Sequence, residues 1–214
     1  RQAGRAKFQP RMRSRQGGVM ASMDMTRLDR DRTYRLLTGI VVPRPIAFVT
    51  TLSESGAVNA APFSSLITLS VEPAMVGIVI GREGGVTKDT LKNIERTGEW
   101  VVNAVSEPLA EQIQRCAEPF PPEASELDAV GLTTVPSQSV ACPRVRESRI
   151  HLECRLDRMV GFGDGPDRLV AGRVLVAHVA DDIIDNFKVD PEKWQPLGRI
   201  AGRKYCRVRE FIDV

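Results

Sequence analysis

Histidine and paired cysteines are scarce in this sequence. Its 214 residues include two histidines, His151 and His178, and four cysteines that lie far apart without a Cys-x-x-Cys pair. A structural zinc site takes four ligands, mostly cysteine and histidine at short spacings, so this composition predicts no metal centre. Free thiols are the simplest account of the cysteines, and they are typical of a protein in a reducing cytoplasm.

Several sequence signatures are also missing. No Gly-x-Gly-x-x-Gly opens a helix, and neither a Walker loop nor a Gly-x-Ser-x-Gly is present. These absences argue against a dinucleotide-binding βαβ domain, a P-loop enzyme and an obvious serine hydrolase. A membrane-spanning helix needs a run of about 18 apolar residues, and none occurs, so no membrane partner is predicted.

Positive charge is concentrated at the start of the chain. Residues 1–18 carry six lysines and arginines and no acid, and subtracting these six from the net charge of +3 leaves −3 for residues 19–214. We therefore divide the chain into a basic arm at 1–23 and one domain at 24–214. The arm is a solvated tail, a leader upstream of the true start, or a segment that packs on a partner subunit.

The stretch at 43–68 predicts a β-hairpin. β-branched and aromatic residues dominate positions 46–51, as in a strand, and Gly56 supplies the positive φ of a tight turn before a return strand at 57–60. Before the hairpin, two prolines hold Arg44 between residues of fixed φ. A surface salt bridge is the alternative role for Arg44.

Small and hydroxyl side chains follow the hairpin turn. Asn59, Ala60, Ala61 and Pro62 precede Ser64 and Ser65. Small residues let the backbone come close to a ligand, and hydroxyls can donate to anionic oxygens. The alternative is an ordinary hairpin with a polar loop.

A helix start at residues 87–94 suits a phosphate group. Thr87 is a good N-cap, and Leu91 and Ile94 fall on one helical face. Free N–H groups, the helix dipole, Lys88 and the hydroxyl of Thr90 would converge there on an anion. The alternative is a capped helix without a ligand.

The rest of the chain predicts more antiparallel strands. Alternating apolar residues at 147–160 and 169–179 flank a glycine-rich turn, which indicates a long hairpin. His178 ends one apolar face, where a histidine either borders a cofactor or is a satisfied structural residue. Arg199 and Tyr205 lie in a basic closing stretch that reaches an anion or a flat ring, or is only a charged strand. The fold class is mainly β, a closed or half-closed barrel with a few short helices.

Three motifs, in order and spacing, resemble the flavin reductase-like family, the FMN-binding split barrels that include flavoredoxins and reductase components of two-component monooxygenases. The motifs are Pro43-Arg44-Pro45-Ile46-Ala47-Phe48-Val49, Asn59-Ala60-Ala61-Pro62-Phe63-Ser64-Ser65 and Lys88-Asp89-Thr90-x-x-Asn93-Ile94. Leu152-Glu153-Cys154, Gly172-Arg173-Val174 and Arg199-x-x-Gly202-x-x-Tyr205 agree as well. Together they cover residues 26–207.

The resemblance implies a homodimer that binds FMN near the subunit interface, with NADH or NADPH as co-substrate. The implied cofactor-binding residues are Arg44, Asn59, Ala60, Ala61, Pro62, Ser64, Ser65, Thr87, Lys88 and Thr90, with His178, Arg199 and Tyr205 as further candidates. Backbone N–H groups of a tight loop at 59–61 would stabilise the negative charge of the reduced flavin. No catalytic side chain is assigned, because the protein mainly positions two flat rings and excludes water.

Three functions remain open on the sequence. The first is an NAD(P)H-dependent flavin reductase that supplies a partner monooxygenase or another acceptor. The second is a flavoredoxin-like electron carrier or an FMN-dependent reductase of a specific organic substrate. The third is a non-enzymatic scaffold whose basic arm binds nucleic acid or a membrane, and the acidic body argues against it.

Overall fold

The computed structural model describes residues 12–13, 20–83, 86–118, 120 and 125–212, and the chain falls into two units, Arg1–Val41 and Val42–Val214. The first unit contains β1 (Met12–Arg13), β2 (Met20–Ala21), the 3-10 turn η1 (Met25–Arg27) and α1 (Arg30–Ile40). Helix α1 begins after Asp29, whose carboxylate accepts a hydrogen bond from the N–H of Arg32 at 2.8 Å. The predicted basic arm lies largely outside the described residues.

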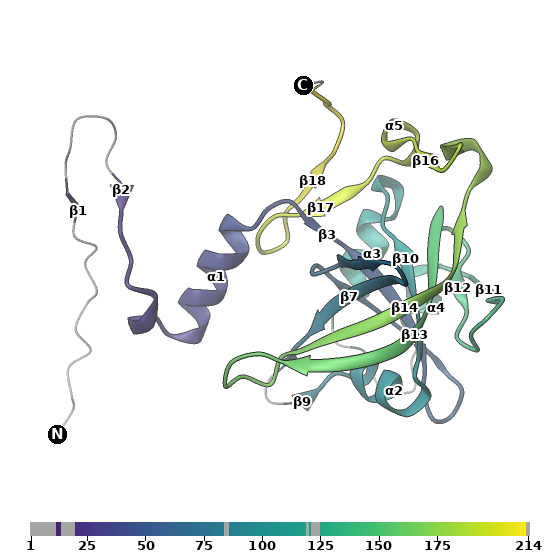
Figure 1. Ribbon diagram of the computed structural model, residues 1–214, viewed down its shortest axis with the longest axis horizontal. Coiled ribbons are helices and arrows are strands. Elements are labelled where there is room, and N and C mark those ends of the chain that lie inside the picture. Colours follow the sequence, from purple (N-terminus) through teal and green to yellow (C-terminus); the bar gives the residue numbers. More distant parts are fainter. Residues whose placement is uncertain (1–11, 14–19, 84–85, 119, 121–124, 213–214) are drawn as a thin grey trace. The chain divides into compact units, whose positions relative to one another are not determined.

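The second unit is built on one antiparallel sheet (Figure 1). Its order is β5 (Val58–Phe63), β4 (Ala47–Leu52), β10 (Glu99–Ala104), β13 (Ile150–Gly161), β14 (Arg168–Val179), β7 (Ala74–Ile80) and β6 (Ile67–Val71). The sheet curls, because β5 at one edge also contacts β7 near the other edge. The mainly β, antiparallel fold is therefore confirmed.

Smaller sheets and short helices complete the second unit. A second sheet has the order β18 (Tyr205–Arg207), β17 (Leu197–Arg199) and β3 (Arg44–Pro45). Two-stranded pairs are β8 (Arg82–Glu83) with β9 (Val86–Thr87), β11 (Thr134–Val135) with β12 (Arg144–Val145), and β15 (Ile184–Asp185) with β16 (Lys188–Val189). The helical elements are α2 (Asp89–Thr97), η2 (Glu107–Leu109), α3 (Ala110–Arg115), α4 (Glu126–Val130), η3 (Asp181–Ile183) and α5 (Pro191–Trp194). None of the helices in the described ranges is long and apolar enough to cross a membrane.

Strand β4 is buried on both faces and separates two cores. Ala47 and Val49 face a core with Trp100 and the apolar side of α2, whereas Phe48 faces a core with residues of α3 and α4. Full burial of a side chain such as Phe48 contributes about 1.5–3 kcal/mol, and the two polar residues of the strand, Thr50 and Thr51, are buried with hydrogen-bonded hydroxyls. The two cores fix β4 and its partner β5 in place.

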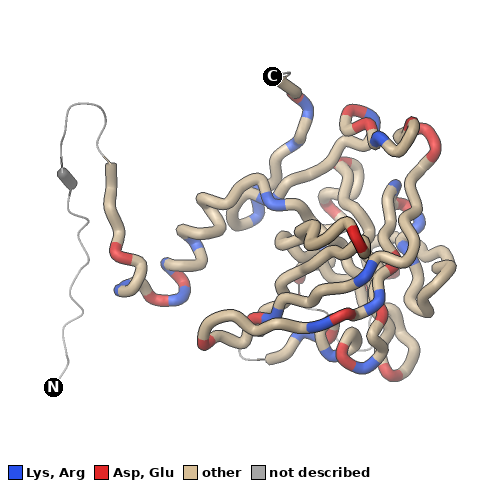
Figure 2. Tube along the Cα trace, in the orientation of Figure 1, with Lys and Arg blue, Asp and Glu red and all other residues tan. Residues whose placement is uncertain are grey.

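Charges of both signs alternate along the second unit (Figure 2). An exposed pair such as Arg203 with Glu118 at 3.1 Å links segments that are distant in the sequence. Each such pair contributes only about 0–1 kcal/mol. The buried apolar side chains, and not these pairs, stabilise the fold.

The hairpin and the following helix differ from prediction in two details. Gly56 has φ +82 in the turn, as predicted, but the return strand β5 continues to Phe63, so residues 59–63 are strand and not loop. Helix α2 has Lys88 at its N-cap position, one residue later than the predicted Thr87, which lies in β9. Gly98 ends the helix in the left-handed region, with φ +69.

Candidate functional site

A buried set of amide and hydroxyl side chains joins β5 to the start of α2. Asn59 donates through Nδ2 to the hydroxyl of Thr90 at 3.0 Å and to that of Thr51 at 3.2 Å. Asn93, one turn along α2, donates to the same Thr51 hydroxyl at 3.0 Å. The structure therefore brings together two motifs that lie about thirty residues apart in the sequence.

The first turn of α2 has the features of an anion site. Lys88 occupies the N-cap position without a side-chain capping bond, since an ammonium group has no acceptor. The first amides of the helix thus point outward beside a cation, at the positive end of the helix dipole. Thr87 is half-buried next to this turn, whereas Thr90 is buried and its hydroxyl is directed at Asn59.

The free edge of β5 is partly covered by Glu126. The N–H of Ala60 donates to Oε2 of Glu126 at 3.1 Å, away from β4. Amides alternate in direction along a strand, so those of Asn59 and Ala61 face β4. The prediction of a loop with several outward N–H groups at 59–61 is therefore wrong, because only the Ala60 amide reaches this edge and Glu126 already accepts it.

Glu126 was not found by the sequence analysis. Burial, with a smaller effect of the Asp89 charge, raises the pKa of its carboxyl group. Its place in the first turn of α4 could have been predicted from Ser125, whose hydroxyl caps the helix by accepting from the N–H of Asp128. Its partner Ala60, 66 residues away, leaves no local pattern.

The two serines after β5 have different partners. The hydroxyl of Ser65 accepts from the N–H of Val79 at 2.9 Å and donates to its carbonyl at 3.2 Å, so it ties this segment to β7. The hydroxyl of Ser64 accepts from Nε of Arg44 at 3.4 Å. Ala61, Pro62 and Ser64 are half-buried.

Arg44, Arg199 and Tyr205 are neighbours in the small sheet. Arg44 is the register partner of Arg199, and Arg199 is that of Tyr205. The guanidinium of Arg199 lies 4.5 Å from the Tyr205 ring centroid, and both side chains donate to Oε1 of Gln114, at 2.9 and 3.0 Å. Arg199 also donates to the Gly202 carbonyl. Burial is the main cause that raises the pKa of Tyr205.

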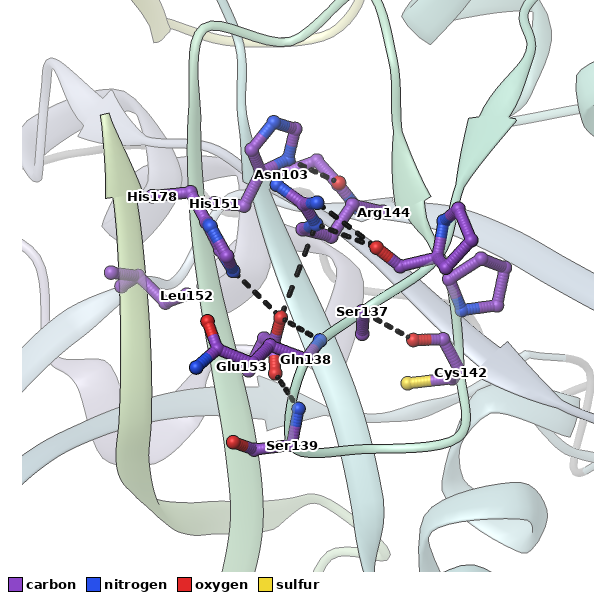
Figure 3. A network of polar contacts seen from close by, with 12 residues as sticks. Asn103, Ser137, Gln138, Ser139, Cys142, Arg144, His151, Leu152, Glu153 and His178 are labelled. Carbon is purple, nitrogen blue, oxygen red and sulfur yellow. Dashed lines mark hydrogen bonds and ion pairs between the residues drawn. The ribbon is translucent and has the colours of Figure 1, made fainter. Parts of the chain in front are cut away.

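His178 belongs to a separate polar network (Figure 3). Its Nε2 lies 2.7 Å from Oε1 of Glu153, a carboxylate that is 0% exposed and also accepts from the amides of Gln138 and Ser139 at 2.8 and 2.6 Å. Burial raises the pKa of Glu153, but these hydrogen bonds outweigh it and leave the pKa below its ordinary value. His178 thus has the satisfied structural environment that was the alternative to a cofactor contact.

The neighbouring His151 is held as a neutral ring. Oδ1 of Asn103 accepts from the N–H of Val145 at 2.7 Å, while Nδ2 of Asn103 donates to the Phe48 carbonyl at 3.0 Å. The same Oδ1 lies 3.0 Å from Nδ1 of His151, so this nitrogen carries the proton and donates. Burial, then the charge of Arg144, lowers the pKa of His151 to about 4.

Neither thiols nor metal ligands form a further reactive centre in the described part of the chain. Its four cysteines are free thiols, and burial raises the pKa of Cys116 and Cys142 to about 12. Such thiols pack as apolar groups and are poor nucleophiles. Within the described ranges, no group of three or more histidine, cysteine or carboxylate side chains is placed to hold a metal ion.

Known proteins resemble most of this chain. The family described as flavin reductase like domain matches residues 39–206. An uncharacterized protein of Halalkalibacterium halodurans is 46% identical over 193 residues, which make up 87% of this chain and 92% of that protein. The uncharacterized protein YwrF of Bacillus subtilis is 40% identical over 184 residues, or 83% of this chain and 90% of that protein.

Solved structures agree with the family match. Nitrilotriacetate monooxygenase component B from Bacillus cereus has a TM-score of 0.88 at 31% identity, covering 92% of this chain and 100% of that chain. The 2-nitrobenzoate 2-nitroreductase NbaA of Pseudomonas fluorescens has a TM-score of 0.82 at 34% identity, covering 90% and 94%. Flavoredoxin of Desulfovibrio vulgaris, at 18% identity and a TM-score of 0.71 over 81% and 91%, is alike in fold alone. These matches confirm the resemblance stated from the motifs and the predicted split-barrel fold.

Proposed function

The chain belongs to the flavin reductase-like family, and we propose that it binds FMN and catalyses the reduction of this flavin by NADH or NADPH. The observation that supports this best is the hydrogen bond from Asn59 to Thr90, because it joins the small-residue strand to the anion-favouring helix start. A flavin mononucleotide needs both features side by side, one for its ring and ribityl chain and one for its phosphate.

The helix start fits the phosphate. Lys88 adds a cation to amides that no N-cap side chain covers, and charge-assisted contacts of this kind are the strong ones. The Asp89 carboxylate would repel a phosphate, but its hydrogen bond from Lys92 at 2.8 Å pairs the charge with a cation. We assign the phosphate to Lys88 with Thr87, Ser64 and Ser65, where Ser65 has to share its hydroxyl with Val79. Thr90 is 1% exposed and its hydroxyl meets Asn59, so it would hold this helix start in place behind the phosphate.

The strand edge fits the ring and the ribityl chain. Ala61 and Pro62 are half-buried and have no long side chains, so a ligand can approach the backbone of β5 there, whereas Ala60 is fully buried behind them. Arg44 stands next to Ser64 and opposite Arg199, which concentrates positive charge at this end of the site. Bound FMN would accept a hydride at its ring and pass electrons on, whereas this chain would bind and orient the flavin, exclude water and offer positive charge.

In this proposal the assembly and the partners are those that the resemblance to the family implies. We expect a homodimer with the flavin near the subunit interface, in the reducing cytoplasm that the free cysteines fit. The likeness to a monooxygenase component B at 31% identity supports a partner oxygenase that consumes the reduced flavin. A flavoredoxin-like role as an electron carrier would use the same site.

A second candidate function is the FMN-dependent reduction of a specific organic compound. It is favoured by the 34% identity, over 90% of the chain, to a protein described as a 2-nitrobenzoate 2-nitroreductase. In this case FMN would remain bound, and the substrate would reach it at the protein.

One measurement tests the proposal and separates it from an electron carrier that uses another reductant. The visible spectrum of the purified protein with FMN is recorded without air, before and after addition of NADPH and, in a second sample, NADH. We expect flavin bands that bleach with at least one nucleotide, and the faster one is the preferred donor. Bands that persist with both would indicate an electron carrier with another reductant, and failure to bind FMN at all would contradict the proposal.

A further inference from the structure

A row of three side chains crosses the small sheet of β3, β17 and β18. Arg44, Arg199 and Tyr205 are register partners from one strand to the next, so they lie on the same face of this sheet. The guanidinium carbon of Arg199 lies 4.5 Å from the centroid of the Tyr205 ring. Contact with an aromatic ring at this distance attracts the cation and restricts the orientation of its planar group.

Gln114 of α3 fixes the guanidinium further. Its Oε1 accepts from Nη1 of Arg199 at 2.9 Å and from the hydroxyl of Tyr205 at 3.0 Å. Nη2 of Arg199 donates to the Gly202 carbonyl at the protein surface. A guanidinium has five N–H groups, and these two hydrogen bonds use only two of them. Arg199 is therefore oriented in advance and keeps donors for another partner.

Arg199 differs from its neighbours in the closing hairpin because it lacks a counter-charge. Arg203 pairs with Glu118 at 3.1 Å, and Arg207 pairs with Glu107 at 2.6 Å. Arg199 forms no ion pair with a carboxylate in the described part of the chain, and both of its acceptors are neutral. A half-buried cation among neutral groups has lost part of its hydration, and an anionic ligand would recover that free energy.

The row of side chains begins beside the flavin site. Arg44 donates through Nε to Ser64, which follows β5, and Arg199 is the next member of the row. FMN has one phosphate, and we assign it to the start of α2 with Lys88. An anion at Arg199 would then belong to the molecule that reacts with the flavin.

A nicotinamide dinucleotide carries such an anion in its diphosphate. Proteins with a dinucleotide-binding βαβ domain hold this diphosphate on a glycine-rich loop at the start of a helix. Because this sequence has no Gly-x-Gly-x-x-Gly, cationic side chains have to take that role. Arg44 and Arg199 face each other across two strands, and each guanidinium can bind two phosphate oxygens in a fork.

We propose that Arg199, oriented by Gln114 and Tyr205, binds the diphosphate of the NADH or NADPH that reduces the flavin. Arg199 is a binding residue in this proposal, and Gln114 is a positioning residue. That the ligand is the hydride donor rests on the function proposed above, whereas the affinity of the site for a diphosphate does not.

Calorimetric titration of the FMN-loaded protein with ADP-ribose tests the site. This compound carries the diphosphate without the nicotinamide ring, so its binding involves no redox step. Adenosine, which has no diphosphate, is the comparison ligand. We expect saturable binding of ADP-ribose that is at least about tenfold tighter than that of adenosine, as charge-assisted contacts would give. ADP-ribose that binds no more tightly than adenosine would overturn the proposal.

Gln114→Glu separates a binding role of Arg199 from a structural one. The new carboxylate keeps the shape of the side chain and still accepts from Arg199 and Tyr205, but it pairs with the guanidinium and cancels its charge. We expect ADP-ribose to bind about tenfold more weakly, with adenosine binding, FMN affinity and melting temperature close to those of the wild type. Unchanged ADP-ribose binding would mean that Arg199 is only structural, and a loss of FMN affinity in its place would assign Arg199 to the flavin. Either result would overturn the proposal.

Arg203→Gln is the matched control. It changes the net charge by the same one unit in the same hairpin, but it removes the partner of Glu118 and leaves Arg199 unpaired. ADP-ribose should bind this variant like the wild type, and an equal loss in both variants would overturn the assignment to Arg199. Arg199→Gln removes the charge directly, so it should weaken ADP-ribose binding as well and replaces Gln114→Glu if that variant does not fold.

The anaerobic spectra with NADPH and NADH are recorded on the same samples. ADP-ribose binding that depends on Arg199, together with flavin bands that persist with both nucleotides, would contradict the proposed function and leave this site standing. Flavin bands that bleach in a protein without affinity for ADP-ribose would do the reverse.

Discussion

Asn59 in β5 donates a hydrogen bond to Thr90 in the first turn of α2 at 3.0 Å. Thr90 is 1% exposed, so this bond lies in a region where a lost partner is costly. The bond sets the distance between the strand edge and the helix start, and in the proposed complex an FMN molecule would span that distance. Pre-set geometry of this kind reduces the entropy lost on binding.

Lys88→Ala should weaken FMN binding by about 1–3 kcal/mol, because it removes a charge-assisted contact to the phosphate. The affinity is measured by flavin fluorescence titration. Riboflavin, which has no phosphate, should bind the variant and the wild type alike.

Arg96→Ala is the control for this prediction. It removes a positive charge from the last turn of the same helix, where the guanidinium donates to the Leu52 carbonyl at 2.7 Å. We expect little change in FMN affinity. A loss as large as that of Lys88→Ala would mean that only the general charge of α2 matters, and an unchanged affinity in Lys88→Ala would remove Lys88 from the site.

Local patterns in the sequence predicted the frame of this site well. Strand-forming patterns identified β4 and the β13–β14 hairpin, and Gly56 marked a place where the chain needs a positive φ. Such features depend on residues that are neighbours in the chain. The predicted start of α2 was one residue too early, because threonine is by intrinsic preference a better N-cap than lysine. In the structure Thr87 belongs to β9, where it pairs with Arg82 of β8, so Lys88 takes the N-cap position.

Contacts between distant segments could not be predicted. Glu126 accepts from the amide of Ala60, and Gln114 accepts from both Arg199 and Tyr205, across 66, 85 and 91 residues. An edge strand offers outward amides that any nearby acceptor can take, and the sequence does not say which one does. The prediction of free amides at 59–61 failed for this reason.

Glu153→Gln should lower the free energy of unfolding by about 3–5 kcal/mol. The substitution removes the negative charge opposite His178 and turns an NH2 group toward an amide donor at Gln138 or Ser139, which leaves buried donors unpaired. Urea unfolding followed by circular dichroism measures it.

Glu95→Gln is the control for this change, because Glu95 is exposed on α2. A surface substitution of this type should change stability by no more than about 0.5 kcal/mol. If Glu153→Gln were as mild as this control, the network of Figure 3 would not stabilise the fold.

The free energy of unfolding should fall as the pH is lowered from 6.5 to 4. The pKa of His151 is about 4 in the folded protein, below the ordinary 6.5, so the unfolded chain binds more protons throughout this window. Stability that depends on a neutral histidine is present above pH 6.5 and is lost at about 1.4 kcal/mol per pH unit, or about 3 kcal/mol over the window.

Glu153 acts in the same direction at lower pH. Its folded pKa is lowered, so its contribution is present above the ordinary carboxyl value and is lost as the pH falls through the folded value. Urea unfolding at intervals between pH 7 and pH 4 measures the His151 effect, and an extension to about pH 3 measures that of Glu153. His151→Gln should flatten the slope above pH 5, and a variant with the full slope would show that other groups titrate there.

Gly172→Ala should destabilise the protein by about 1–3 kcal/mol, although a glycine-to-alanine change in a strand often stabilises through the unfolded state. A Cβ at this position would lie 2.8 Å from Cζ2 and 2.9 Å from Nε1 of Trp100, a fully buried ring. Gly165→Ala is the control, because a Cβ there meets no atom within 4 Å, and it should be neutral or slightly stabilising. The melting temperature of each variant is compared with that of the wild type. Destabilisation only at Gly172 would mean that this glycine is required by the close approach of Trp100, whereas two equally mild variants would mean that the indole can shift and that the core around it is not tightly packed.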